Sequence, residues 1–325
     1  MAMADKKVEV FAAIIIGCVG VFFVFGMPFF VGGIISELGL SQSQANLVSS
    51  AEIAGMALSS MLGFFWIQRY EWKTIAYFGI TVIILGNFIS SIGFSEEPSF
   101  SLLVMVRFLT GLFGHGVCFS LGVAAIGRTN NPDKNFAYSV AAQVIMGSLT
   151  ALLVPMAMSK YGISGMTIPA IFLALIGLFF VKYLFVNNPS ETNDGQTQDE
   201  SKIIFLPLIG LLIMVVWQMG VGPFFNNLVP YGIGNGISSD AIGIALFVST
   251  AMSIIGPISA SMLIDKVDRS HAIFGALTVQ ILIILSFTGE ITWIGFMLRA
   301  ICFQMAWNFV GPFLMGMIAA VDRSG

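Results

Sequence analysis

Charged residues are scarce in this chain of 325 residues. Asp, Glu, Lys and Arg together make up 10% of it, hydrophobic residues make up 57%, and the mean hydropathy is +0.93. Soluble domains carry about 25% charged residues. The composition therefore excludes a water-soluble domain, a disordered chain and a nucleic-acid binder, and it indicates a surface that mostly faces the lipid bilayer.

Cysteine and histidine are also few, with three and two residues. All three cysteines lie in apolar runs, which is typical of small buried hydrophobic residues rather than of a disulfide framework. The two histidines, His115 and His271, are far apart in the sequence, so we expect no metal site. The Gly-x-x-x-x-Gly-Lys-Ser/Thr motif of nucleotide binding is absent. The apolar runs also lack paired acids or a Ser/His cluster, so we expect neither a cofactor nor an enzyme.

Long apolar runs fill the rest of the chain, and each is long enough to cross a hydrocarbon core of about 30 Å. They predict an all-α polytopic membrane protein with ten spans, at 10–35, 45–67, 74–94, 101–127, 136–158, 164–186, 203–230, 239–264, 272–289 and 291–320. One long polar segment, 187–202, separates the first six runs from the last four and has the composition of a flexible linker. We expect an N-terminal half at 1–186 and a C-terminal half at 203–325.

The placement of Lys and Arg predicts the orientation. Eleven of the 14 lie in the N-terminal segment and in every second loop, two lie inside spans, and only Lys160 lies in a loop of the opposite set. Because positive residues concentrate on the cytoplasmic side, we expect the N-terminus and the 187–202 segment to be cytoplasmic. The predicted location is the plasma (inner) membrane.

Spans seven to ten repeat spans one to four. Three pairs of segments match at offsets of 195, 197 and 192 residues: Gly26-Met27-Pro28-Phe29-Phe30 with Val221-Gly222-Pro223-Phe224-Phe225, Gly39-Leu40-Ser41 with Gly236-Ile237-Ser238, and Arg107 with Arg299. A nearly constant offset indicates an internal duplication, with both halves in the same orientation.

The loops and the fourth span resemble those of the major facilitator superfamily. The segment Ser261-Met-Leu-Ile-Asp265-Lys266-Val-Asp268-Arg269 is similar to the superfamily's loop motif, and Arg107-Phe-Leu-Thr-Gly111-Leu-Phe-Gly114 is similar to the Arg-x-x-x-Gly pattern of its fourth helix. The matching loop of the first half has Gln68 where the superfamily has Asp. The resemblance implies a gating role for six loop residues: Gln68, Arg69, Lys73, Asp265, Lys266 and Arg269.

The resemblance also implies secondary transport of a small solute, by alternating access to a site near the membrane midplane. Two halves of six helices form the superfamily plan, and the second half here has four, so the last two helices are missing from this sequence. Two alternatives stay open at this stage: a secondary transporter, or a truncated, non-transporting remnant or membrane interaction protein. The implied partners are a solute and the bilayer.

Glu52, Arg107 and His115 are the ionisable side chains that lie inside the first four spans. Such residues are functional candidates because a charge within the bilayer is costly. One hypothesis makes Glu52 a proton-coupling group with Arg107 as its partner, which would add protons to the partners. The alternative is a static ion pair. His115 is a second proton-coupling candidate, although a packing histidine between Gly111, Gly114 and Gly116 is the favoured interpretation.

The candidates for substrate contact lie mostly in the second half. They are Arg299, Arg107, Gln304, Asn308, Trp307, Trp217, Gln218, Asn226 and Gln143. Two arginines at similar depth would suit a carboxylate or phosphate, which makes a small organic anion the suggested substrate. For the amides, the alternative is hydrogen bonding between helices, which is common in membrane proteins.

Overall fold

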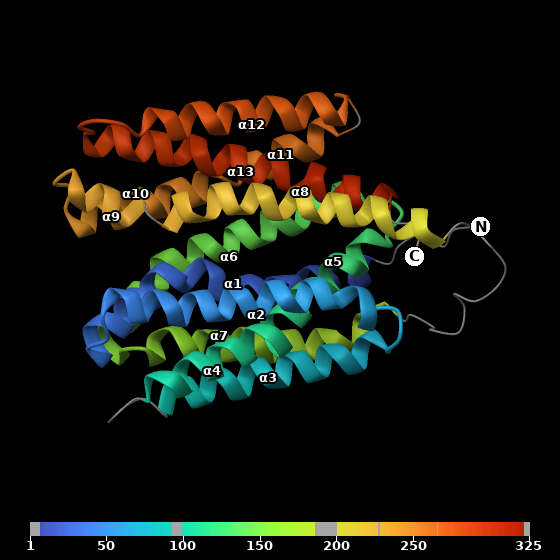
Figure 1. Cartoon of the computed structure of the whole chain (residues 1–325), viewed down its shortest axis with the longest axis horizontal. Coiled ribbons are helices and arrows are strands. Elements are labelled where there is room, and N and C mark those ends of the chain that lie inside the picture. Colours follow the sequence, from blue (N-terminus) through green and yellow to red (C-terminus); the bar gives the residue numbers. More distant parts are fainter. Residues whose placement is uncertain (1–6, 93–98, 186–199, 227, 265, 322–325) are drawn as a thin grey trace. The chain divides into compact units, whose positions relative to one another are not determined.

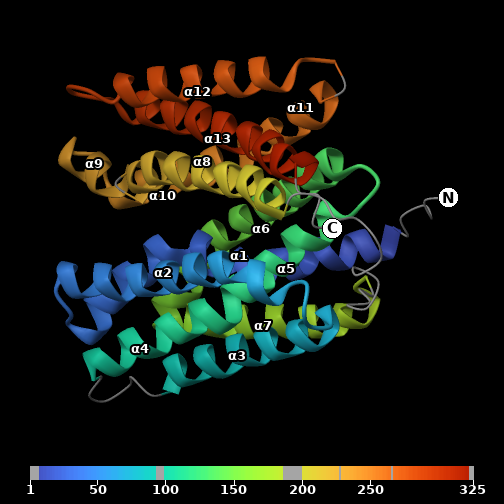
Figure 2. The ribbon, with the colours of Figure 1, turned by 45° about the vertical axis from the view of Figure 1, so that its right-hand side comes forward.

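The computed structural model describes residues 7–92, 99–185, 200–226, 228–264 and 266–321. These residues form helices joined by short turns and contain no strand, so the prediction of an all-α protein is confirmed (Figures 1 and 2). The contacts divide the chain into two compact units, 1–126 with 152–193 and 127–151 with 194–325. Helix α6 (Pro132–Tyr161) is shared between them. The expected boundaries of the halves, at 186 and 203, stay predictions.

The first unit is a bundle of long helices that run side by side (Figure 1). Helix α3 packs against α7, α1 packs against α7 and α2, and α2 packs against α4 and the π-helix that continues it. Its elements are α1 (Lys7–Leu38), α2 (Gln42–Trp66), α3 (Trp72–Ile92), α4 (Phe100–Thr110), the π-helix η1 (Gly111–His115), α5 (Gly116–Gly127), α7 (Ser164–Phe180) and the 3₁₀ turn η2 (Val181–Tyr183). The segments α4, η1 and α5 follow one another without a break and together form the expected fourth span.

The second unit is built around α13, which packs against α8, α10, α11 and α12. Its elements are α8 (Glu200–Asn226), α9 (Leu228–Gly234), α10 (Ser239–Met252), α11 (Ile255–Leu263), α12 (Arg269–Ser286) and α13 (Trp293–Val321). The expected eighth span is therefore divided into two helices, α10 and α11, and the expected seventh span covers the described helical segments α8 and α9. The unit's buried core includes Leu228, Ile242, Ala245 and Phe296.

Local sequence explains why the repeated Gly-x-Ser segments match. Gly39 and Gly236 adopt positive φ angles of 63° and 76°, a conformation that glycine reaches without steric cost. Two residues later, Ser41 and Ser238 are the N-caps of α2 and α10, each accepting a backbone N–H with its hydroxyl. The repeat thus preserves the turn that starts α2 in the first unit and α10 in the second.

Every predicted span falls on one to three helical segments, and eight stretches of the described chain are long and apolar enough to cross a membrane. Helix α2 is not among these eight. Its sequence includes the polar residues Gln42, Gln44, Asn46 and Glu52, which lower its hydropathy. Within α8, the apolar segment Leu212–Gly222 is shorter than these eight. The 187–202 segment lies largely outside the described residues.

Candidate functional site

A buried ion pair joins α2 to α4 in the first unit. Nε of Arg107 donates to Oε2 of Glu52 over 2.9 Å, and Nη2 of Arg107 donates to Oε1 of the same carboxylate. Neither side chain has any exposed surface. This two-point geometry is the arrangement in which arginine and a carboxylate bind each other most strongly.

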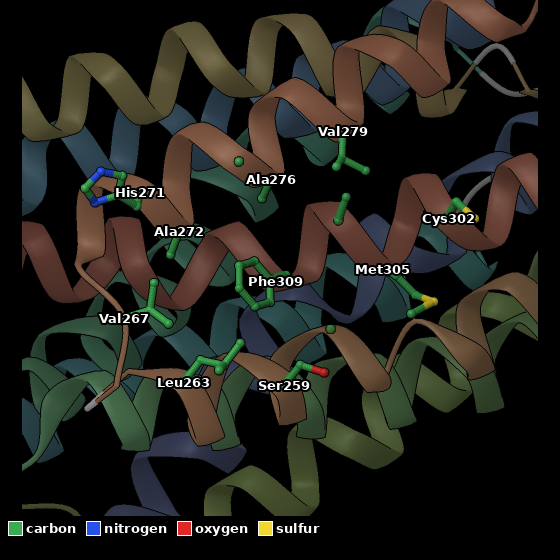
Figure 3. A pocket seen from close by; sticks show the side chains of 13 residues that line it. Ser259, Leu263, Val267, His271, Ala272, Ala276, Val279, Cys302, Met305 and Phe309 are labelled. Atoms are coloured by element: carbon green, nitrogen blue, oxygen red, sulfur yellow. The ribbon is translucent and has the colours of Figure 1, made fainter.

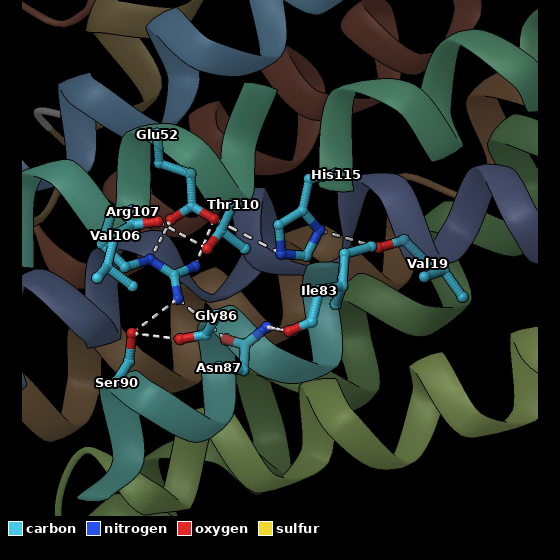
Figure 4. A network of polar contacts seen from close by, with 10 residues as sticks. All are labelled: Val19, Glu52, Ile83, Gly86, Asn87, Ser90, Val106, Arg107, Thr110 and His115. Atoms are coloured by element: carbon cyan, nitrogen blue, oxygen red, sulfur yellow. Dashed lines mark hydrogen bonds and ion pairs between the residues drawn. The ribbon is translucent and has the colours of Figure 1, made fainter. Parts of the chain in front are cut away.

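Polar side chains of α3 (Figure 4) and an aromatic ring of α1 complete the environment of the guanidinium. Nη1 of Arg107 donates to Oδ1 of Asn87 over 3.0 Å and to Oγ of Ser90 over 3.3 Å. Asn87 and Ser90 are held in turn by hydrogen bonds to backbone carbonyls of their own helix. The ring of Phe23 lies 3.8 Å from Cζ of Arg107, close enough for a cation–π interaction. The positive charge is thus held by three neighbouring helices.

Glycines bring the backbones of α2 and α4 into contact at this site. A Cβ on Gly111 would collide with the backbone of Glu52, and a Cβ on Gly55 would collide with the carbonyl of Phe108. Small residues at such crossings let membrane helices approach closely. The crossing lies beside the ion pair, so the glycines set the distance over which Glu52 and Arg107 meet.

His115 lies beside the ion pair, whereas the sequence favoured a packing role for it. Its Nε2 is 3.5 Å from Oε1 of Glu52 and has no hydrogen-bond partner in the described part of the chain, while Nδ1 is 3.2 Å from the carbonyl oxygen of Val19. In a regular α-helix the eight residues from Arg107 to His115 would rotate the side chain by about 80°. The π-helix Gly111–His115 adds one residue to a turn, which offsets about 100° of rotation and returns His115 to the face of Arg107.

Arg299 on α13 has a different environment. It is half-buried, its Cζ lies 6.0 Å from the ring of Phe287, and it forms no ion pair with any carboxylate that the structure describes. The crossing of the helices explains the difference. In the first unit Gly55 packs against the carbonyl of Phe108, the residue after Arg107, and in the second unit Gly256 packs against the carbonyl of Met305, the residue after Gln304.

Counted from the crossing, Gln304 therefore occupies the place that Arg107 has in the first unit. Its Nε2 donates to Oγ of Ser249 over 2.6 Å, and its Oε1 accepts from Oγ1 of Thr250 over 3.0 Å. One turn further, Nδ2 of Asn308 donates to Oγ of Ser253 over 2.9 Å. Both amides thus lie on one face of α13, as expected, and in this structure they bond to α10 and to the turn that follows it.

The other candidates of the second unit are spread over several helices. Nε1 of Trp217 donates to Gln280 over 3.0 Å, and Nε2 of Gln143 donates to Ser139 over 3.2 Å. The ring of Trp307 packs against Phe225 and Phe303, with centroids 5.4 Å and 5.8 Å apart. Gln218 is exposed, and the side chain of Asn226 lies outside the described part of the structure.

The expected gating loop is organised by an ion pair and a helix cap. Nη2 of Arg269 donates to Oδ2 of Asp133 over 2.6 Å. Asp268 is the N-cap of α12, and the backbone N–H groups of His271 and Ser270 hold the pKa of its carboxyl below the ordinary value. Lys266 and Arg69 are exposed, Gln68 and Lys73 are half-buried, and Asp265 lies outside the described residues.

A groove of about 470 Å³ lies among α11, α12 and α13, and most of the side chains that line it are apolar (Figure 3). None of the candidate binding residues lines it. Among the residues that the structure describes, no group of three His, Cys, Asp or Glu side chains is placed to hold a metal ion. The residues that sequence reasoning missed are Asn87, Ser90 and Phe23. A polar residue inside the third span was the available signal for Asn87.

Comparison with known proteins places the chain in a family. The sequence model of the Major Facilitator Superfamily matches residues 12–322 of this chain. Among solved structures, a D-xylose-proton symporter is 15% identical and has a TM-score of 0.72, with 98% of this chain and 87% of that one covered. The inward-open xylose transporter XylE from E. coli is 14% identical and has a TM-score of 0.63, with 97% of this chain and 87% of that one covered. A peptide transporter POT in complex with sulfate is 15% identical and has a TM-score of 0.54, with the same coverage of the two chains. No curated protein matches the sequence. The chain therefore belongs to the Major Facilitator Superfamily, and it is a multi-pass membrane transporter rather than an enzyme.

Proposed function

We propose that the chain is a proton-coupled secondary transporter and that Glu52 is its proton-binding group. The observation that carries the proposal is a carboxylate whose ionised form is held by Arg107, with no exposed surface on either side chain. Arginine stays charged under all physiological conditions. The proton must therefore bind at Glu52, and binding it weakens the attraction between α2 and α4.

The energetics of a buried pair make such a change large enough to matter. Breaking a buried ion pair by neutralising one partner commonly costs several kcal/mol, because the other charge is left in a medium of low dielectric. Here Asn87, Ser90 and the Phe23 ring still contact Arg107 when Glu52 is neutral. The guanidinium thus keeps partners in both protonation states, which is what a reversible coupling site needs.

For the substrate we propose a small organic anion that contacts Arg299. This arginine lies beside Phe287 and forms no ion pair with a described carboxylate, so its charge is available to a ligand. The neighbouring aromatic rings, Phe224 and Phe287 with centroids 5.0 Å apart, offer apolar surface to the rest of such a solute. The proposed orientation places the N-terminus in the cytoplasm of a cell with the transporter in its plasma (inner) membrane.

A reconstitution experiment tests the coupling. Purified full-length protein in proteoliposomes is assayed with labelled lactate, succinate and benzoate, with and without an inward proton gradient. We expect the gradient to drive accumulation of an anion by the wild type. Glu52→Gln should retain exchange of labelled for unlabelled anion across the membrane, and it should lose accumulation against the gradient.

Two variants serve as controls. Glu71→Gln removes an exposed carboxylate of the loop before α3 and should accumulate like the wild type. Arg299→Gln should lose anion binding while the Glu52–Arg107 pair stays intact. Accumulation by Glu52→Gln at the wild-type level would overturn the coupling role. Wild-type protein that moves no solute at all would favour a non-transporting membrane protein.

A further inference from the structure

We propose that His115 accepts a hydrogen bond from protonated Glu52 and so provides the second of two alternative partners for this carboxyl, Arg107 being the first. This inference rests on the proposed role of Glu52 in proton coupling and assigns a positioning residue to it. In the ionised state the carboxylate is held by Arg107. In the protonated state the O–H group of Glu52 points to Nε2 of the imidazole.

The backbone of α1 determines the tautomer of His115. Nδ1 lies 3.2 Å from the carbonyl oxygen of Val19, and a carbonyl oxygen can only accept. Nδ1 of the imidazole therefore carries the hydrogen and donates it. In the neutral ring the other nitrogen, Nε2, then has a lone pair and no hydrogen, so it is an acceptor.

This acceptor faces another acceptor. Nε2 is 3.5 Å from Oε1 of Glu52, and although it is fully buried it has no hydrogen-bond partner among the residues that the structure describes. Two lone pairs that face each other gain nothing from the contact, and an unsatisfied buried polar atom is costly. One proton on Oε1 changes the contact into an O–H···N hydrogen bond, so the contact with His115 favours the protonated carboxyl, whereas Arg107 favours the ionised one.

The same proton competes with the arginine. Oε1 is also the oxygen that accepts from Nη2 of Arg107, whereas Oε2 accepts from Nε. A proton on Oε1 therefore weakens the hydrogen bond from Nη2, because a hydroxyl oxygen is a poorer acceptor than a carboxylate oxygen, and it leaves the hydrogen bond from Nε in place. The proton stays on Glu52 throughout, and the imidazole remains neutral, because a second positive charge would lie close to the guanidinium.

The elements packed around His115 restrict its movement. Val19 and the ring of Phe23 contact it from α1, and the centroid of the Phe23 ring is 5.8 Å from that of the imidazole. Glu52 contacts it from α2. A Cβ on Gly20 would collide with the backbone of His115 and Phe119, so α1 lies directly against this helix. Glu52 and Arg107 are the ionisable side chains that face the ring.

Infrared spectroscopy of the full chain in proteoliposomes tests the proposal without any substrate. The carbonyl stretch of protonated Glu52 is identified as the band that is lost in Glu52→Gln. His115→Phe keeps a ring for packing and removes the acceptor. We expect the band to move to higher frequency in this variant, and its pH midpoint to move by about one unit to lower pH, about the effect of one hydrogen bond. His115→Gln, which can still accept, should lie nearer the wild type. An unchanged band in His115→Phe would overturn the proposal.

A second measurement uses the wild type and does not depend on the folding of a variant. The chain has only two histidines, so nitrogen-15 spectra of labelled protein can be assigned with His271→Gln. We expect a neutral ring with hydrogen on Nδ1 at every pH, and an Nε2 signal that changes as Glu52 protonates. Hydrogen on Nε2, or an Nε2 signal that also changes in Glu52→Gln, would overturn the inference. If coupled accumulation requires Glu52 and these signatures are absent, only the role of His115 fails. If accumulation survives Glu52→Gln, the proposed function itself fails.

Discussion

Removal of either partner of the buried ion pair is expected to destabilise the first unit, but the loss depends on pH only when Arg107 is the partner removed. In Arg107→Met the carboxyl of Glu52 loses its counter-charge and takes up a proton, because a neutral carboxyl is cheaper to bury than a charged one. In Glu52→Met the guanidinium cannot lose its proton. It stays charged and keeps only Asn87, Ser90 and the Phe23 ring.

The magnitudes follow from the unfolded state. In Arg107→Met the folded protein binds one more proton than the unfolded chain, in which glutamate ionises near pH 4.3. The sign is therefore a loss of stability as pH rises, with a slope of about 1.4 kcal/mol per pH unit above that value. The free-energy cost of protonating Glu52 on folding of this variant is about 1 kcal/mol at pH 5 and about 3.7 kcal/mol at pH 7. In Glu52→Met the loss should be about 3–5 kcal/mol and independent of pH over this range.

Unfolding of the purified full chain in detergent micelles, followed by circular dichroism at pH 5, 6 and 7, measures these differences. The double variant with Met at both positions should be more stable than Glu52→Met and independent of pH. The pair Arg269–Asp133, whose side chains are 35% and 18% exposed, is the control, and its coupling energy should be about 0–1 kcal/mol. If Arg107→Met shows no slope, or if the two substitutions are additive, water reaches the ion pair and the reasoning is refuted.

Two further predictions concern the helix crossings. Gly111→Ala places a methyl group against the backbone of α2 and should cost about 1–3 kcal/mol of stability. In the control Gly220→Ala the new methyl group meets no atom within 4 Å, and the substitution should be neutral or slightly stabilising. Equal thermal unfolding temperatures for the two variants would contradict the close approach of the helices at Gly111. Gln304→Leu leaves the Thr250 hydroxyl without its acceptor and should cost about 0.6–2 kcal/mol. Asn308→Leu should cost less, because its partner hydroxyl keeps a backbone acceptor, and the reverse order in the same assay would contradict the assignment.

Helix positions were predictable because the membrane makes one property decisive. A span must be apolar over about 20 residues, and every expected run coincides with helix in the structure. The Gly-x-Ser repeat was equally readable, since a positive φ favours glycine and a helix start favours serine. Both interpretations of Glu52, a proton-coupling group and a member of a static ion pair, made Arg107 its partner, and the structure shows the ion pair itself. Its role in coupling stays a proposal.

The relation between the two halves was only partly readable. The sequence match pairs Arg107 with Arg299, and both lie at comparable positions from the start of their helices. The crossing of the helices is deeper in the second unit, where Gly256 meets the carbonyl of Met305. Gln304 therefore stands at the crossing and Arg299 lies outside it. A constant offset in the sequence reflects the duplication of the two halves. The point at which two helices approach most closely depends instead on which small residues face each other.

The sequence by itself determined the membrane class, the helices, the duplication and the candidate residues, because these follow from composition and from local periodicity. Only the tertiary structure decided which of these residues meet. It brought Asn87 and Ser90 to the guanidinium from a separate helix. Through the π-helix it also rotated His115 towards Glu52. The physical reason is that the phase of a side chain around its helix, and the partner it faces, depend on backbone hydrogen bonding and on close packing between segments far apart in the sequence.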